Sequence, residues 1–140
     1  MKRVVVAAGV ALALAAPAQL PAGARSEGDQ VKAVLLTQAR LLRQGRFRVM
    51  YRTTYTPAFR AHCPWRTYLK RQRFGRSYLG PRFSVRNIRV RMLSPTRALL
   101  AYRFVRTNGR TAANVTFRQR DRFAKLGGRW YDEYDSVSDC

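Results

Sequence analysis

The chain has 140 residues, which leaves room for one folded domain with one core and excludes a second domain of ordinary size. It carries 28 Lys and Arg against 7 Asp and Glu, a formal net charge of +21. Such a surface attracts polyanions. Arginine supplies 24 of the 28 basic residues, and a GC-rich genome would produce the same excess, so the charge alone does not assign a partner.

Residues 1–24 have the pattern of a secretory signal peptide. A charged start, Met1-Lys2-Arg3, precedes an apolar run at 4–16 that is too short to span a bilayer as a helix. Ala22-Gly23-Ala24 is a candidate cleavage site, and Ala16-Pro17-Ala18 is a second one. We therefore expect an exported, soluble single domain over residues 25–140, with no membrane span.

After the predicted signal peptide, apolar residues recur at helical spacing. Ser26 and Asp29 form a capping-box-like start, and apolar residues recur at helical spacing from Val31 to Leu42, before a stop at Gly45. The pattern predicts a first helix over about 27–44 and a short second one from 47 to 55. Thr56-Pro57 is typical of a helix start, and Pro64 can open a further helix that ends near 74–75. Residues 75–82 are then predicted to link the helices to a sheet.

From residue 83 onward the apolar period changes to two, which indicates strands. Four strands are predicted, over 83–93, 97–107, 110–124 and 129–137, and the short turns between them favour an antiparallel meander. Asn108-Gly109 is a strong hairpin signal. In the first strand the apolar parity switches between Val85 and Ile88, which predicts a β-bulge near Arg86 or Asn87 that bends the sheet.

This order of elements resembles the nuclear transport factor 2-like superfamily, which includes ketosteroid isomerase-like and related secreted proteins. The resemblance covers about 27–137 and rests on the long helix, on YRTTYTPAFRAHCPW at 51–65 and on the closing hairpin FAKLGGRWY at 123–131. It implies an α+β fold in which N-terminal helices pack on a strongly bent, cone-shaped, four-stranded antiparallel sheet. It also implies a pocket between helix and concave face, in which the superfamily's enzymes place acids, tyrosines or histidines.

Polar residues that could face such a pocket are few. Asp121 shares its strand parity with apolar Phe117 and Phe123, so it is the candidate catalytic base for proton abstraction next to a carbonyl. The alternative is that Asp121 lies at the surface and forms an ion pair with an arginine. The candidate oxyanion donors are Tyr51, Tyr55, Tyr68 and Tyr102. The alternative is that these tyrosines pack in the core. The expected lining of the pocket is Tyr51, Tyr55, Tyr68, Tyr102, Phe117 and Trp130.

Cys63 and Cys140 allow a single intramolecular pairing, and we predict a disulfide because an exported protein meets an oxidising environment. Pairing between molecules through a frayed tail is the alternative. His62 next to Cys63 does not predict a nucleophile and base, because sequence neighbours usually point apart. The single histidine and the scattered acids have no metal-ligand spacing, so neither a metal nor a cofactor is expected.

Arg118, Arg120 and Arg122 lie on the strand parity opposite to Asp121, and Arg103 of the neighbouring strand can join them. Together with Arg86, Arg89 and Arg91 they could form a positive strip on the outer face that binds anionic envelope polymers, or simply a solvated face. No surface aromatics accompany them, so specific nucleic-acid recognition is not expected. A homodimer through this face is conceivable from the resemblance, although its arginines oppose one.

Three functions stay open at this point. The absence of a catalytic constellation favours an exported, non-catalytic binding or accessory domain for a small apolar ligand. The second is a pocket isomerase or dehydratase that acts on a small apolar carbonyl compound, with Asp121 as base. The third is electrostatic attachment to anionic polymers of the cell envelope.

Overall fold

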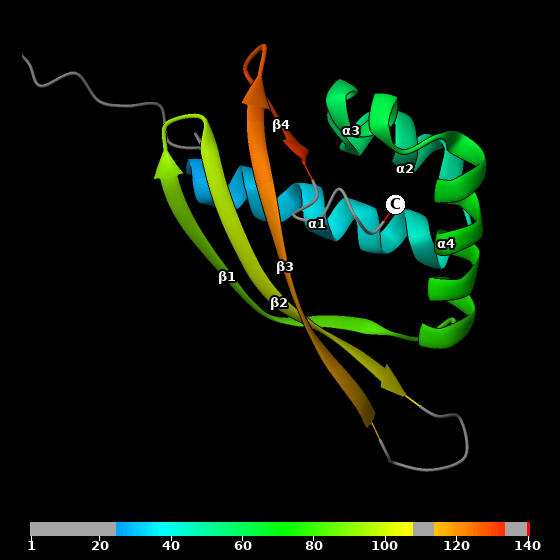
Figure 1. Cartoon of the computed structure of the whole chain (residues 1–140). Helices are drawn as coiled ribbons and strands as arrows, with labels where there is room; N and C mark the ends of the chain where they lie inside the picture. Colours follow the sequence, from blue (N-terminus) through cyan, green and yellow to red (C-terminus); the bar gives the residue numbers. More distant parts are fainter. Residues whose placement is uncertain (1–24, 108–113, 134–139) are drawn as a thin grey trace, which may run out of the picture.

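Helices come first and strands second in the computed structural model, which describes residues 25–107, 114–133 and 140 (Figure 1). Of residues 107 and 114–119 only the backbone is described. The predicted signal peptide, the Asn108-Gly109 turn and the predicted strand ends at 110–113 and 134–137 lie outside the described residues. The elements are α1 (Glu27–Arg43), α2 (Phe47–Thr54), α3 (Pro57–His62), α4 (Trp65–Leu79), β1 (Ser84–Ser94), β2 (Arg97–Thr107), β3 (Asn114–Leu126) and β4 (Arg129–Asp132).

The start of α1 follows from its capping residue. The Ser26 Oγ accepts a hydrogen bond from the Asp29 backbone N at 3.1 Å, which satisfies one of the free N–H groups of the first turn. Glu27 and Asp29 place negative charge at this end, and Arg40 and Arg43 place positive charge at the other, as the helix dipole favours. These features confirm the predicted first helix.

The end of the last helix differs from the prediction. We expected a stop near 74–75, but α4 continues through Gly75 to Leu79. One glycine inside a helix costs only about 1 kcal/mol, which neighbouring turns can offset. The true stop is Gly80, whose φ of 77° and ψ of 171° are accessible to glycine but strained for other residues, and Pro81 follows it.

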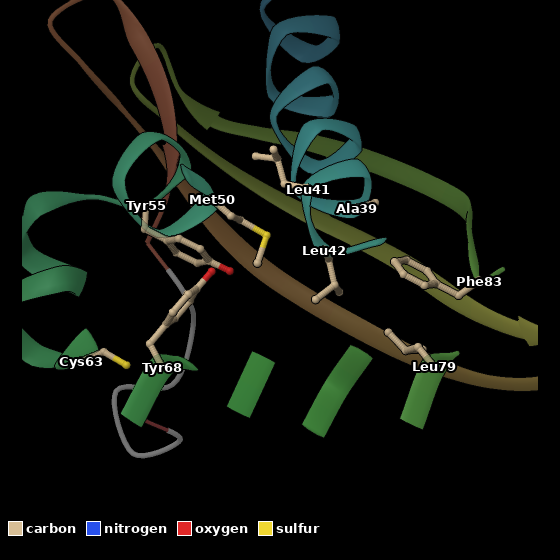
Figure 2. Close-up of a cluster of buried hydrophobic side chains, with 9 residues drawn as sticks. All are labelled: Ala39, Leu41, Leu42, Met50, Tyr55, Cys63, Tyr68, Leu79 and Phe83. Carbon is tan, nitrogen blue, oxygen red and sulfur yellow. The ribbon is translucent and has the colours of Figure 1, made fainter. Parts of the chain in front are cut away.

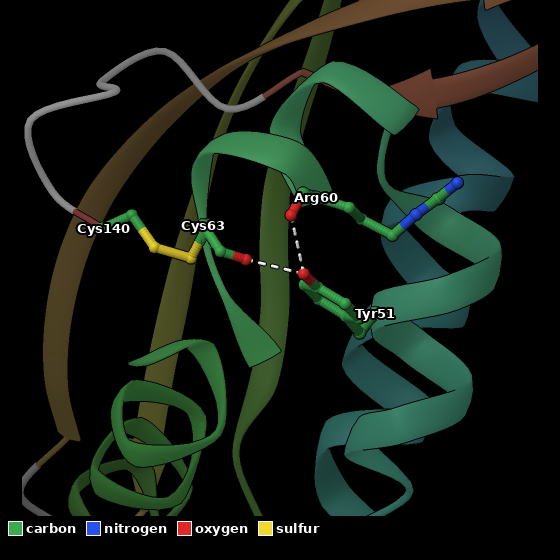
Figure 3. Close-up of a disulfide and its surroundings, with 4 residues drawn as sticks. All are labelled: Tyr51, Arg60, Cys63 and Cys140. Carbon is green, nitrogen blue, oxygen red and sulfur yellow. Dashed lines mark hydrogen bonds between the residues drawn. A yellow bond between two sulfur atoms is a disulfide. The ribbon is translucent and has the colours of Figure 1, made fainter. Parts of the chain in front are cut away.

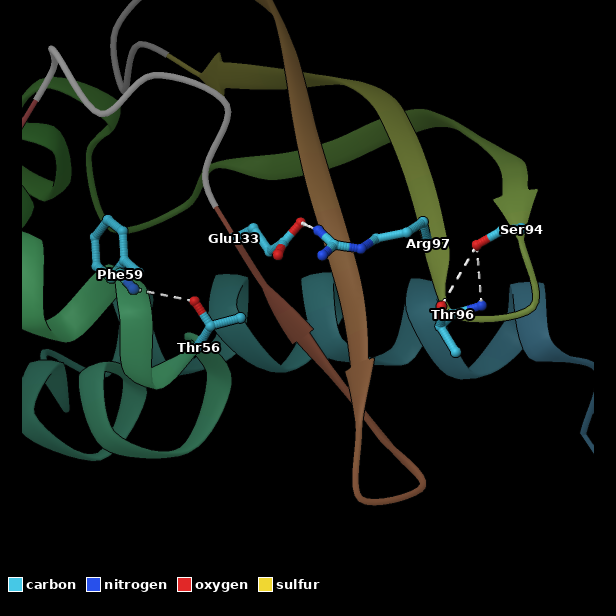
Figure 4. A network of polar contacts seen from close by, with 6 residues as sticks. All are labelled: Thr56, Phe59, Ser94, Thr96, Arg97 and Glu133. Carbon is cyan, nitrogen blue, oxygen red and sulfur yellow. Dashed lines mark hydrogen bonds and ion pairs between the residues drawn. The ribbon is translucent and has the colours of Figure 1, made fainter.

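The sheet is antiparallel in the order β1-β2-β3-β4, which confirms the predicted meander and the α+β class. Its bend is set in β1, where the register with β2 shifts between Arg86 and Arg89 and Asn87 has a φ of 54°. The bulge is thus where the parity switch predicted it. At the β1–β2 turn the Ser94 Oγ accepts from the Thr96 backbone N at 3.2 Å (Figure 4).

The core has two parts. One lies between α1 and the concave face of the sheet, where Val31 and Leu35 pack against residues such as Leu100, Phe123 and Trp130. The other lies among the helices and at the start of β1 (Figure 2). Its buried members are Ala39, Leu41, Leu42, Met50, Tyr55, Cys63, Tyr68, Leu79 and Phe83. The two parts together place α1 in the middle of the domain, between the sheet and α4.

Cys63 and Cys140 form a disulfide with a Cα–Cα distance of 5.4 Å (Figure 3). The bridge spans 77 positions and anchors the last residue to the junction between α3 and α4. Next to it, the Tyr51 hydroxyl donates toward the backbone carbonyls of Cys63 at 2.6 Å and Arg60 at 2.9 Å. In the chain-entropy model a loop of this length is worth about 4 kcal/mol.

Glu27, at the start of α1, ties the helix to the far hairpin of the sheet. Its carboxylate accepts from Lys125 Nζ at 2.7 Å and from the Trp130 indole N–H at 2.6 Å. These two donors, Lys125 first, lower the pKa of Glu27 below its usual value. None of the described helices has the length and apolar character that a membrane crossing requires.

The two glycines of α4 allow a matched test of this fold. A Cβ at Gly75 or at Gly80 would meet no atom within 4 Å, but only Gly80 has a positive φ. We expect Gly75→Ala to raise the free energy of unfolding by about 0.5–1 kcal/mol, because alanine is the better helix former. Gly80→Ala should lower it by about 1–3 kcal/mol through backbone strain. Urea denaturation measures both, and effects of the same sign would contradict the helix end assigned here.

Candidate functional site

A cavity of about 620 Å³ lies between α1, α4 and the concave face of the sheet. Most of its wall is apolar, which suits the body of a small organic molecule. The apolar side chains that line it are Leu35, Ala39, Leu42, Met50, Leu79 and Phe104. The polar side chains described next come from α1, β2, β3 and β4 and from Tyr55, between α2 and α3.

Asp121 and Tyr102 form the first polar pair of the cavity. Asp121 is 3% exposed, and the Tyr102 hydroxyl donates a hydrogen bond to its Oδ2. Both residues line the cavity. Asp121 therefore faces inward rather than lying at the surface, as strand alternation predicted. The candidate base and one candidate oxyanion donor are hydrogen-bonded to each other.

Asp132 and Gln38 form the second pair. Asp132 is 2% exposed, and Gln38 donates from Nε2 to its Oδ2 at 2.9 Å. The same amide lies 3.3 Å from the Thr54 Oγ1, which donates to the Met50 carbonyl at 2.7 Å. Asp132 and Gln38 both line the cavity, so a second buried carboxylate borders it.

Tyr55 adds a hydroxyl close to both acids. Burial, with Tyr68, Asp132 and Asp121 nearby, raises the pKa of Tyr55 well above 10.0. Burial likewise raises the pKa of Tyr68. Figure 2 shows the two hydroxyls turned toward one another, and that of Tyr68 has no hydrogen-bond partner of normal geometry among the described residues. Both phenols therefore stay protonated at any physiological pH.

Three residues expected in the pocket are not among the described side chains that line it. Trp130 packs against the start of α1, where its indole is held by Glu27. Tyr68 is 1% exposed in the helical core, and its ring centroid lies 4.7 Å from that of Tyr51. The Tyr51 hydroxyl bonds backbone carbonyls. The core-packing alternative thus describes all three, whereas Tyr55 and Tyr102 line the cavity. The side chain of Phe117 lies outside the described residues.

The outer wall of the cavity is the inner side of α4. Thr67, Arg71, Gly75 and Tyr78, spaced at three or four positions, lie along it. Phe74 also lines the cavity, although it is 72% exposed, and its ring stacks on Tyr78 with centroids 6.2 Å apart. An aromatic pair at the rim gives an apolar ligand a surface to contact on entry.

The predicted arginine strip lies on the opposite face of the sheet from this cavity. Arg120 and Arg122 are exposed and Arg103 is half-buried, while the side chain of Arg118 lies outside the described part of the chain. Near the end of β4, Glu133 pairs with Arg97 at the start of β2 (Figure 4). Among the described residues no group of three or more His, Cys, Asp or Glu side chains could hold a metal ion.

Sequence reasoning did not assign Gln38 or Asp132 to the site, although both carried a signal. Gln38 falls on the buried stripe of α1, between Leu35 and Leu42, at a position where a polar residue needs a partner. Asp132 shares the parity of buried Trp130 in β4. What the pattern could not supply is that these two positions face one another.

Comparison with known proteins bears on the fold alone. No family model matches the chain, and no curated protein matches it. Among solved structures, a SEC-C motif-containing protein from Rhodopseudomonas palustris is similar with a TM-score of 0.54 and 16% identity, over 77% of this chain and 78% of that one.

Two further structures are similar at the same level. A putative scytalone dehydratase from Novosphingobium aromaticivorans has a TM-score of 0.51 and 15% identity, over 75% of this chain and 78% of that one. A SEC-C motif-containing protein from Psychrobacter arcticus has a TM-score of 0.52 and 13% identity, over 83% and 65%. These neighbours are compatible with a nuclear transport factor 2-like fold.

The shifted tyrosines generate a prediction about alkaline stability. Because folding raises the pKa of Tyr55 and Tyr68, the folded state keeps two protons that the unfolded state releases above about pH 10. Their contribution is therefore fully present below pH 10 and is lost as the pH rises further, by about 1.4 kcal/mol per pH unit for each tyrosine.

Above pH 10, we expect Tyr68→Phe to make the free energy of unfolding fall less steeply with pH, by the contribution of one proton, about 1.4 kcal/mol per pH unit. Urea denaturation at a series of pH values measures this. The tyrosinate absorbance of the folded wild type should also show two phenols that ionise only on unfolding. The denatured chain, in which all 7 tyrosines titrate, is the control. Complete ionisation before unfolding would contradict the burial of this pair.

Proposed function

We propose that this chain is an exported binding protein of the nuclear transport factor 2-like superfamily that holds one small, mainly apolar molecule in the cavity behind α4. The observation that carries the proposal is the cavity itself. Its volume of about 620 Å³ lies within the range of small-molecule sites, and its walls are largely apolar with a few convergent polar groups. Export is supported by the composition of residues 1–24, and the Cys63–Cys140 disulfide is compatible with an extracytoplasmic location.

The polar groups of the cavity suggest which chemical group the ligand carries at one end. Asp121 and Asp132 present buried carboxylate oxygens, and a carboxylate only accepts hydrogen bonds. A ligand with a hydroxyl or amine at one end and an apolar body would match both these acidic side chains and the apolar walls. We therefore propose an apolar molecule with a terminal hydrogen-bond donor.

Binding without catalysis is favoured by the Tyr102–Asp121 hydrogen bond. An isomerase of the kind considered above needs a base that reaches the substrate carbon and a donor that reaches the developing oxyanion. Here the Tyr102 proton is directed at the Asp121 carboxylate, so the candidate donor and the candidate base engage each other.

A pocket isomerase or dehydratase is the second candidate, and one observation favours it: Asp121 is inward-facing and borders a cavity large enough for a substrate. In that case Asp121→Asn would abolish turnover of a small apolar carbonyl compound without weakening its binding. In a binding protein the same change alters affinity, and there is no turnover to lose.

Gly75 offers a way to test the cavity as a binding site. It lies on the cavity wall, and a Cβ there would meet no atom within 4 Å, so a larger side chain can extend into the open space. We expect the neutral dye Nile red to bind the wild type saturably, with one molecule per chain, as measured by fluorescence. Gly75→Leu should weaken this binding about tenfold or more, because the leucine occupies volume that the dye needs.

Gly75→Ala is the matched control, since it makes the same improvement in helix propensity without filling the cavity. It should bind Nile red within about twofold of the wild type. Equal affinity of the alanine and leucine variants would place the dye elsewhere and contradict the proposed site.

A further inference from the structure

The convex face of the sheet carries a lattice of arginines, and none of the described helices covers it (Figure 1). The register places Arg86 directly opposite Arg103, and Arg103 opposite position 118, in one row across three strands. A second row runs from Arg89 through Ala101 to Arg120. A third runs from Arg91 through Leu99 to Arg122.

Arginines elsewhere in the chain have structural partners. Arg43 donates to the Phe83 carbonyl at 3.1 Å, Arg76 donates to the Arg43 carbonyl at 3.2 Å, and Arg60 donates to the Tyr55 carbonyl at 2.6 Å. Arg97, at the start of β2, pairs with Glu133. These residues tie helix ends and strands together, so no ligand is needed to explain their positive charge.

The lattice differs from that group. Arg86, Arg89, Arg91, Arg103 and Arg120 make no hydrogen bond, ion pair or ring contact within the part of the chain that the structure describes, and four of the five are exposed. Like charges directly opposite one another on a sheet destabilise it, so the Arg86–Arg103 row costs stability. Strand alternation places these arginines on the outer face, and the register of the sheet brings them into rows.

We propose that this lattice, which we call the convex arginine face, binds a flexible linear polymer that carries a phosphate group on each repeat. Arg89 and Arg91, like Arg120 and Arg122, are two positions apart on one strand and therefore about 6.8 Å apart, while Ala101 and Leu99 separate the arginines of the second and third rows by two strand spacings, about 9.6 Å, so one polymer chain can meet several guanidiniums at once. The guanidinium fork matches phosphate geometry. This site is separate from the cavity, and its function does not depend on what the cavity holds.

The shape of the face favours a flexible polymer over other polyanions. The bulge at Asn87 bends β1, so the rows follow a curved surface that a chain can wrap, whereas a flat lipid surface or a stiff duplex meets only part of it. The rows contain no aromatic side chain on which bases could stack. Two copies of the protein would bring like charges together at this face, which disfavours a second copy as its occupant.

Long-chain inorganic polyphosphate is the probe for this proposal, with affinity measured at several salt concentrations. The triple variant Arg86→Gln, Arg89→Gln and Arg120→Gln should bind the polymer at least about tenfold more weakly. The slope of the logarithm of the binding constant against the logarithm of the salt concentration should also become shallower by about two, because each phosphate contact contributes about 0.7. It should fold normally, because the substitutions remove repulsion between like charges. Thermal unfolding checks this.

The control variant removes the same charge from the helices: Arg52→Gln, Arg66→Gln and Arg73→Gln, all exposed and none lining the cavity. It should keep its affinity within about twofold and its slope unchanged. An equal loss in the two variants would show that net charge alone attracts the polymer and would overturn the site. Tighter binding of duplex DNA or of anionic vesicles, at equal phosphate concentration, would overturn the flexible polymer as the partner.

Discussion

A buried hydrogen bond between Gln38 and Asp132 holds together parts of the chain that are 94 positions apart. It joins the middle of α1 to the last described strand, and the backbone of Asp132 accepts from the Thr56 N at 3.0 Å, so the α2–α3 junction meets at the same point. A buried carboxylate is tolerated only where hydrogen bonds replace its hydration. The interaction therefore fixes how α1 sits in the bent sheet, and it leaves an acidic group facing the cavity.

The arginine excess separates into two groups once positions are known. Some guanidiniums, such as those of Arg43 and Arg76, serve backbone carbonyls near helix ends, where a positive charge also suits the helix dipole. Others, such as Arg86, Arg89 and Arg120, lie in register on the convex face and make no contact of that kind within the described chain. The two faces of the sheet thus differ in chemistry, with a mainly apolar cavity on the inside and guanidiniums on the outside.

Local signals predicted much of this architecture. The cap at Ser26 and the spacing of Val31 and Leu35 gave the first helix, and the parity switch after Val85 gave the bulge, because both patterns depend only on neighbours in sequence. Parity also predicted that Asp121 faces inward. Prediction failed where a distant contact decides. Trp130 and Tyr68 are core residues because of what packs on them, and no local pattern separates a core aromatic from one that lines a cavity.

The coupling between Gln38 and Asp132 is the most direct test of this account. A double-mutant cycle with Gln38→Ala, Asp132→Ala and the double variant, followed by urea denaturation, isolates the free energy of their interaction from the loss of each side chain. A buried hydrogen bond to a charged group should give a coupling of about 1.5–3 kcal/mol. Additive losses, within about 0.5 kcal/mol, would mean that apolar packing and the Glu27 contacts hold α1 on the sheet without this pair, and would contradict the account.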